Sequence, residues 1–201
     1  MPLEQAIMFD LGGVLIDWDP RYLYRKVYDE AETEFLLANV CTSRWNLAMD
    51  AGRPFDEAIA ERQREWPAYS EAIAWWKTRW VEMLRGPVPG TVELLKALVD
   101  RGHPVFALTN WSAETFPLAR ERFAFLGWFR DIVVSGEVGL AKPDPDIYHL
   151  AERRCGFRRK GTVFIDDSAA NIETARALGY DAIRFKGAEA LRLSLNERGL
   201  L

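Results

Sequence analysis

The sequence predicts an α/β protein: a Rossmann-like parallel sheet core with a small all-helical cap inserted after the first strand. Short apolar runs that end in polar residues recur along the chain, and segments with helical periodicity separate them. This alternation is typical of a parallel sheet with helices on both faces. One long interval, residues 18–88, breaks the alternation. We therefore expect a core made of residues 1–17 and 89–201, and a helical cap made of residues 18–88.

Five apolar runs are expected to form the strands of the core. They are residues 6–9, 104–110, 131–136, 162–168 and, as the weakest of the five, 181–185. Each is short, as expected for strands buried on both faces of a sheet. Polar residues follow several of these runs directly, so they should gather along one edge of the sheet.

Four segments with helical periodicity lie between or after these strands, at residues 91–102, 112–126, 145–157 and 169–179. Gly102 and Gly179 are suited to the position that follows a helix. Ser112 is expected to cap the second helix, and Pro145 suits the first turn of the third. The sequence thus predicts that helices connect successive strands.

The interval 18–88 holds six of the eight tryptophans, has a helical pattern, and contains no segment that we expect to form a strand. The stretch GPVPG at residues 86–90 is the expected hinge through which the chain returns to the core. Most of these tryptophans are expected to pack inside the cap, and one or two to line a pocket.

Composition excludes several classes of protein. A net charge of −4 argues against a nucleic-acid partner, and no apolar stretch is long enough to predict a membrane span. Two cysteines and two histidines are too few for a disulfide framework or a histidine-rich zinc site. We expect a cytoplasmic monomer or homodimer whose chemistry depends on carboxylates, lysine, hydroxyls and amides.

Three of the predicted strands end in such residues. Asp10 follows the first, Thr109 and Asn110 end the second, and Asp166 and Asp167 end the fourth. Carboxylates that lie close together repel one another unless a cation lies between them. Mg²⁺ prefers oxygen ligands and is commonly held by one or two carboxylates. The pattern favours a magnesium site at this edge of the sheet.

Four segments then resemble the motifs of a known family. FDLGGVL (9–15), LTN (108–110), KPDP (142–145) and FIDDSAAN (164–171) resemble, in order and spacing, the four motifs of the haloacid dehalogenase-like (HAD) hydrolase superfamily. The helical interval resembles the cap of its capped phosphatase branch, whose sugar-phosphate phosphatases include members with a D-x-G first motif. This resemblance implies Mg²⁺-dependent hydrolysis of a small organic phosphomonoester, such as a sugar phosphate, through an aspartyl-phosphate.

The resemblance also implies a role for each motif residue. Asp10 corresponds to the nucleophile, Thr109 and Asn110 to groups that hold the phosphoryl oxygens, and Lys142 to the ammonium that offsets their charge. The expected Mg²⁺ ligands are Asp10, the Gly12 carbonyl, Asp167 and, directly or through water, Asp166, with Asn171 in support. Gly12 and Gly13 should let main-chain N–H groups approach the phosphoryl group.

One position departs from the family pattern. Most phosphatases of the family carry a general acid two residues after the nucleophile, where this chain has Gly12. Asp17 and Asp19 are the nearest carboxyls in sequence that could replace it. Two alternatives stay open: a metal-free 2-haloacid dehalogenase that uses Asp10 as its nucleophile, and a weakly active homologue with a binding or regulatory role.

The cap is expected to contribute residues that face the substrate. The candidates are Trp18, Arg44, Trp45 and Asn46, together with Trp111, which follows Asn110 in the core. A cap over the site favours a small substrate over a macromolecular one.

Overall fold

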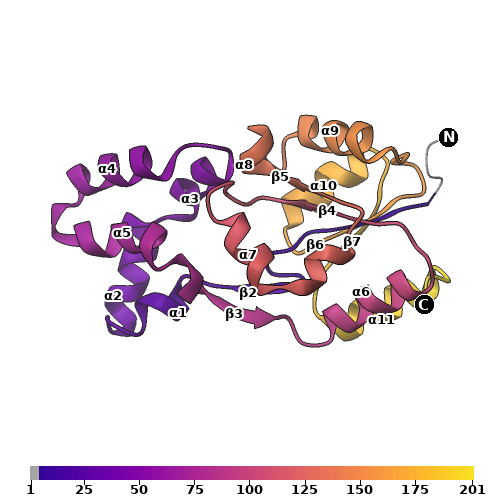
Figure 1. Ribbon diagram of the computed structural model, residues 1–201, viewed down its shortest axis with the longest axis horizontal. Coiled ribbons are helices and arrows are strands. Elements are labelled where there is room, and N and C mark those ends of the chain that lie inside the picture. Colours follow the sequence, from indigo (N-terminus) through magenta and orange to yellow (C-terminus); the bar gives the residue numbers. More distant parts are fainter. Residues whose placement is uncertain (1–4) are drawn as a thin grey trace.

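The computed structural model describes residues 5–201 and contains a five-stranded sheet in the order β5-β4-β1-β6-β7 (Figure 1). All four neighbouring pairs are parallel. The strands are β1 (Ile7–Phe9), β4 (Val105–Thr109), β5 (Asp131–Val134), β6 (Val163–Asp166) and β7 (Asp181–Arg184). The predicted α/β parallel fold is confirmed, and the strand that ends at Asp10 lies at the centre of the sheet.

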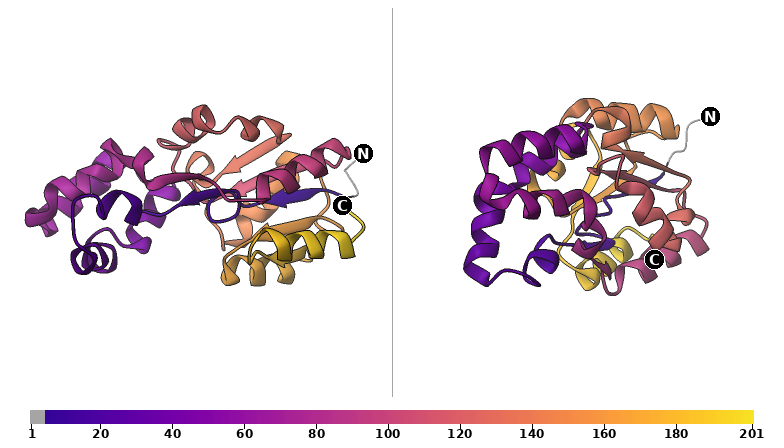
Figure 2. Two further views of the ribbon diagram at one scale, coloured as in Figure 1. Left: turned by 90° about the horizontal axis from the view of Figure 1, so that it is seen from below. Right: turned by 60° about the vertical axis from the view of Figure 1, so that its left-hand side comes forward.

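Helices cover both faces of this sheet (Figures 1 and 2). On one face, α6 (Thr91–Asp100) and α11 (Ala188–Glu197) pack their leucines into the same apolar cluster as Ile7 and Phe9. On the other face, α9 (Pro145–Cys155) and α10 (Ala169–Ala177) share a second cluster with Met8. Alternate side chains of β1 therefore enter opposite layers, as the pleat of a strand requires.

The helix boundaries largely follow the local signals in the sequence. Gly102 and Gly179 follow α6 and α10 with φ angles of +82° and +95°, a region that glycine adopts without a steric penalty. Pro145 opens α9, where Asp144 caps the helix by accepting the N–H of Asp146. These local choices agree with the layers that the helices form.

The chain between β2 (Ile16–Trp18) and β3 (Leu84–Pro87) forms a group of helices that extends from one end of the sheet core (Figure 1). These helices are α1 (Arg21–Tyr24), α2 (Glu30–Phe35), α3 (Ser43–Asp50), α4 (Phe55–Glu65) and α5 (Ser70–Thr78). Shorter turns cover Leu36–Val40, Pro67–Tyr69 and Trp80–Met83. Trp76 is almost completely buried, and its ring contacts those of Trp18 and Trp45.

Two expectations from the sequence are wrong in detail, and two helices were not predicted. The interval 18–88 does contain strand residues, because β3 pairs antiparallel with β2 as a two-stranded ribbon. Ser112 caps no helix: α7 spans Phe116–Arg122, and a separate 3₁₀ segment covers Ala124–Trp128. The short α8 (Ser135–Val138) and the longer α11 lie outside the predicted helices. Strands of three and four residues are too short to show an alternating pattern in the sequence. Pro117 delays the start of α7.

Within residues 5–201, no helix combines the length and apolar character needed to cross a lipid bilayer.

Candidate functional site

The carboxyl ends of β1, β4 and β6 bring together side chains from four separate segments of the chain. Asp10 follows β1, Thr109 ends β4 and Asp166 ends β6. These three strands are adjacent in the sheet, which is why residues that are far apart in the sequence meet. Lys142 reaches the same place from the segment between α8 and α9.

Lys142 is a buried cation between two carboxylates. Its Nζ lies 3.0 Å from Asp10 Oδ1 and 2.6 Å from Asp166 Oδ2. Burial alone would lower the pKa of Lys142, but the charges of Asp10 and Asp166 outweigh it, and the net pKa is raised. The ammonium is therefore held in its charged form beside the carboxylate of Asp10.

The carboxylate of Asp166 is surrounded by donors and is inaccessible to solvent. Besides Lys142, it accepts hydrogen bonds from Asn171 Nδ2 at 3.0 Å and from the Ser168 N–H at 2.8 Å. Ser168 is also the N-cap of α10, so the start of this helix positions the carboxylate. These contacts make Asp166 the group that orients Lys142.

Asp167 has the opposite environment, because its side chain is exposed. One oxygen of each of Asp10, Asp166 and Asp167 lies within 4.8 Å of the others. Gly13 makes this approach possible: a Cβ atom at that position would lie 2.7 Å from Asp167 Oδ2, and its φ of +74° also favours glycine.

The charges in this cluster do not balance. When all groups are ionised, three carboxylates face the single ammonium of Lys142, which leaves two negative charges. Burial, with the charges of Asp166 and Asp167, raises the pKa of Asp10 although Lys142 opposes the shift. Partial desolvation and the charge of Asp166 also raise the pKa of Asp167. A hard divalent cation with oxygen ligands fits this donor set, and Mg²⁺ is such a cation.

The end of β4 contributes a hydroxyl without a partner. Thr109 Oγ1 is buried and has no hydrogen-bond partner among the residues that the structure describes. A buried hydroxyl without a partner is energetically costly and is rare in folded proteins. It is the kind of group that an oxygen-rich ligand would satisfy.

The side-chain amide of Asn110 hydrogen-bonds to the backbone of Lys142. Its Nδ2 donates to the Lys142 carbonyl, and its Oδ1 accepts the Lys142 N–H, both at 2.8 Å. These bonds use one of the two Nδ2 hydrogens, and the expectation that the amide helps to hold a phosphoryl oxygen stays a prediction. The amide fixes the backbone that carries Lys142.

The two glycines of the first motif also differ from one another. The Gly13 N–H donates to the Ile16 carbonyl at 2.9 Å, so it is not free to bind an anion as expected. The Gly12 N–H has no partner within residues 5–201. A Cβ atom added at Gly12 would meet nothing within 4 Å, so the missing acid leaves open space.

The two carboxyls that lie nearest to Gly12 in the sequence do not fill the open space beside it. Asp17 accepts the hydroxyl of Tyr22 on both oxygens, and Asp19 accepts the backbone N–H of Arg21 at the start of α1. Neither lines the cavity beside Gly12. Their contacts are those of a turn that leads into the helices.

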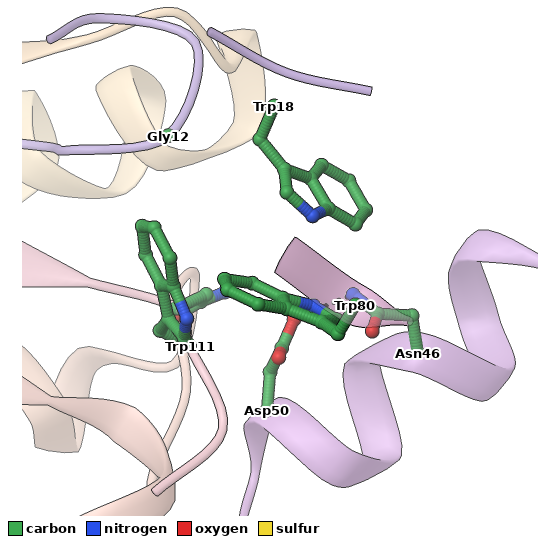
Figure 3. Close-up of a pocket in the computed structure, with 7 residues that line it drawn as sticks. Gly12, Trp18, Asn46, Asp50, Trp80 and Trp111 are labelled. Atoms are coloured by element: carbon green, nitrogen blue, oxygen red, sulfur yellow. Dashed lines mark hydrogen bonds between the residues drawn. The ribbon is translucent and has the colours of Figure 1, made fainter. Parts of the chain in front are cut away.

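The cavity beside Gly12 has a volume of about 60 Å³, and residues of the sheet core and of the helices between β2 and β3 line it (Figure 3). It is lined by Gly12, Trp18, Asn46, Asp50, Trp80, Asn110 and Trp111. Trp18, Asn46 and Trp111 were expected to face the substrate. Trp45 instead packs inside the helical group, where its Nε1 donates to the Ala58 carbonyl, and Arg44 is exposed outside this cavity. Sequence reasoning missed Asp50 and Trp80, and no local motif marks either residue.

Comparison with known proteins agrees with the site. A family model described as haloacid dehalogenase-like hydrolase matches residues 4–179. A phosphorylated carbohydrates phosphatase of Thermotoga maritima is 28% identical over 185 residues, which cover 89% of this chain and 83% of that protein. An (S)-2-haloacid dehalogenase of Pseudomonas fluorescens is 30% identical over 95 residues, covering 47% of this chain and 41% of its own.

Among solved structures, a HAD-family enzyme of Bacteroides thetaiotaomicron, crystallised as an Asp-to-Ala variant with magnesium and inorganic phosphate, has the same fold. The TM-score is 0.69 at 23% identity, and the alignment covers 92% of this chain and 95% of that one. The family match spans most of the chain and includes all four motifs at the sheet edge. The chain belongs to the haloacid dehalogenase-like hydrolases.

Proposed function

We propose that this protein is a Mg²⁺-dependent phosphatase that hydrolyses a small organic phosphomonoester through an aspartyl-phosphate on Asp10. The observation that carries the proposal is the cluster of Asp10, Asp166 and Asp167, with carboxylate oxygens within 4.8 Å of one another and one buried lysine beside them. A metal-free site would gain little from three carboxylates held so close together.

The residues support a two-step reaction. In the first step, a carboxylate oxygen of Asp10 attacks phosphorus while the bond from phosphorus to the leaving oxygen breaks. In the second step, water attacks the phosphorus of the acyl phosphate, which releases inorganic phosphate and restores the Asp10 carboxylate. We propose that Lys142, Thr109 Oγ1 and the Gly12 N–H hold the phosphoryl oxygens in both steps, which is supported by the position of Lys142 beside Asp10 and by the lack of other partners for the two donors.

A bound Mg²⁺ would compensate the charge on the phosphoryl oxygens. Asp10, Asp167 and the Gly12 carbonyl are the groups we propose to hold it, with Asp166 bound directly or through water. The donor contacts of Asp166 favour the second of these arrangements, because Lys142, Asn171 and Ser168 already occupy its oxygens.

We further propose that residues 18–88 act as a cap that closes over the phosphoryl site. The β2–β3 ribbon is the connection that would carry the motion. A cavity shared between Gly12 and the helical residues Asn46 and Asp50 supports a small substrate enclosed between the two parts.

Phosphate release from a panel of phosphomonoesters, measured with Mg²⁺ and with EDTA, tests the proposal. We expect release that requires Mg²⁺, and a beryllofluoride adduct visible by ¹⁹F NMR in the wild type but not in Asp10→Asn. Absence of release from every ester would overturn the proposal.

The dehalogenase alternative has its own signature. Chloride release from 2-chloropropionate without metal, with ¹⁸O from labelled water entering the Asp10 side chain, would show an ester intermediate hydrolysed at the carboxylate carbon. A phosphatase of the proposed kind leaves the Asp10 oxygens unlabelled, because water attacks phosphorus.

A further inference from the structure

The cavity beside Gly12 contains buried polar groups that the proposed chemistry does not use. Indole Nε1 atoms of Trp18 and Trp111 are buried and have no hydrogen-bond partner among the residues that the structure describes. Trp111 is 5% exposed, and both rings line the cavity. In Figure 3 the indole nitrogen of Trp18 faces the space between its ring and that of Trp80. Indole N–H groups only donate, so a ligand that satisfies them must carry acceptors.

Asp50 presents the complementary chemistry. It is the last residue of α3, and its Oδ2 accepts a hydrogen bond from Asn46 Nδ2 at 2.7 Å. Asn46 is itself fixed, because its Oδ1 accepts the Nε1 hydrogen of Trp76 at 3.0 Å. A carboxylate has about four acceptor sites. Among the described residues, the Asn46 amide is the donor that hydrogen-bonds to this carboxylate, so Asp50 can accept further hydrogen bonds from a ligand.

No cation balances Asp50 inside the cavity, since none of the seven lining residues is basic. Burial raises the pKa of Asp50 to about 7, although Ser112 and Asn46 act to lower it. In either protonation state the carboxyl can hydrogen-bond to a hydroxyl, which both donates and accepts. An ammonium group would pair with Asp50 but cannot accept from the two indoles, and an alkyl group would leave every polar atom unsatisfied.

Resting on the phosphatase function proposed above, we infer that this cavity holds the leaving group of the substrate, and that Asp50, Trp18 and Trp111 select a compact leaving group that carries hydroxyls. The volume of about 60 Å³ admits about four water-sized groups, enough for a few hydroxyl-bearing carbons. Gly12 and Asn110, which lie within two residues of Asp10 and Thr109 in sequence, line the cavity together with Asp50 and Asn46 of α3. The tryptophan faces are suited to the C–H surfaces of such a group.

A matched series of alkyl phosphates tests this inference. n-Propyl phosphate, 3-hydroxypropyl phosphate and glycerol 1-phosphate have the same carbon chain and differ in hydroxyls, and O-phosphoethanolamine carries an ammonium instead. We expect kcat/KM of the wild type to rise by about 10-fold or more from propyl phosphate to glycerol 1-phosphate. Preference for propyl phosphate or for O-phosphoethanolamine would overturn the inference.

Variants identify the residues that make the selection. In Asp50→Asn and in Trp111→Phe, the ratio of kcat/KM for glycerol 1-phosphate to that for propyl phosphate should fall by about 10-fold. Asp146→Asn, which changes an exposed aspartate in the first turn of α9, is the matched control and should keep the wild-type ratio. A ratio that stays unchanged in both cavity variants would overturn the assignment.

Binding without turnover gives a second readout. In Asp10→Asn protein, quenching of tryptophan fluorescence reports binding of glycerol 1-phosphate, and adding Asp50→Asn should weaken it by about 10-fold. p-Nitrophenyl phosphate separates the two proposals, because it has a good leaving group and needs no hydroxyl contact. If wild-type protein hydrolyses neither this ester nor any of the alkyl phosphates, the phosphatase function is wrong. If it hydrolyses this ester but shows no preference within the alkyl series, only the leaving-group inference is wrong.

Discussion

Asp10 combines burial with a like-charged neighbourhood, and this combination defines its chemistry. It is 8% exposed, its Oδ1 accepts the Leu11 N–H at 2.7 Å, and Lys142 lies on the same oxygen. Its other oxygen has no protein donor within residues 5–201. A carboxylate that is fixed on one side and free on the other is suited to attack an electrophile.

Replacing this residue tests its role directly. We expect Asp10→Asn to lower phosphate release by at least about 10³-fold, because an amide is a poor nucleophile. The fold should survive, and the melting temperature without metal should equal or exceed that of the wild type, since one of three repelling carboxylates is lost. Phosphate release and thermal unfolding check the two parts, and turnover at the wild-type rate would contradict a covalent mechanism on Asp10.

Gly12 is the second residue whose identity matters on its own. Because a Cβ at this position would meet nothing within 4 Å, Gly12→Asp should be accommodated. An added general acid is worth about 10²–10⁴-fold where leaving-group protonation limits the rate. We expect the variant to hydrolyse alkyl phosphates faster, with little change for p-nitrophenyl phosphate. A slower reaction with alkyl phosphates would mean that the added side chain displaces the leaving group from the cavity instead of protonating it.

At the scale of elements, the end of β6 places two consecutive aspartates in unlike surroundings. Asp166 points into the buried network, and Asp167 remains exposed beside Gly13. This difference follows from the pleat of the strand and from the start of α10 at Ser168, whose N–H binds Asp166. The two residues should therefore respond differently to the same substitution.

We expect Asp166→Ala to lower the free energy of unfolding by about 3–5 kcal/mol, because it leaves Lys142 buried without its nearest partner. Asp167→Ala should change stability little and should weaken Mg²⁺ binding more strongly than Asp166→Ala. Urea unfolding and isothermal titration with Mg²⁺ measure the two effects. Equal losses of stability in both variants would contradict this division of roles.

At the scale of the whole molecule, the fold determines the net charge of the site, because the sheet brings together carboxylates from segments that are far apart in the sequence. In the metal-free protein, the raised pKa values of Asp10 and Asp167 mean that the folded state binds protons more tightly than the unfolded chain. The free energy of unfolding that these groups contribute therefore increases as the pH falls from neutral towards the ordinary carboxyl range.

Metal binding should show the opposite dependence on pH. Because Mg²⁺ binds the ionised carboxylates, its apparent affinity should rise several-fold between pH 6 and pH 8, with release of protons. Calorimetric titration in buffers of different ionisation enthalpy measures both the affinity and the protons released. An affinity that is constant over this range would show that Asp10 is already ionised without metal.

The sequence by itself determined the parallel α/β class, the strands that end at the site and the position of each motif residue. The class and the strands depend on local patterns, namely apolar runs and helix-ending glycines, and the motif residues were identified from the resemblance to the family. The sequence also showed that glycine stands at position 12, where most phosphatases of the family carry a general acid.

Only the tertiary structure decided which polar groups form hydrogen bonds with one another. The Asn110 amide binds the Lys142 backbone, the Gly13 N–H binds the Ile16 carbonyl, and the Trp76 indole binds Asn46. Each pairing joins residues by distance and direction in space, and hydrogen bonds depend on both. No periodicity marks Asp50 at the end of α3. Its chemistry arises from burial without a cation, which is a property of the folded chain.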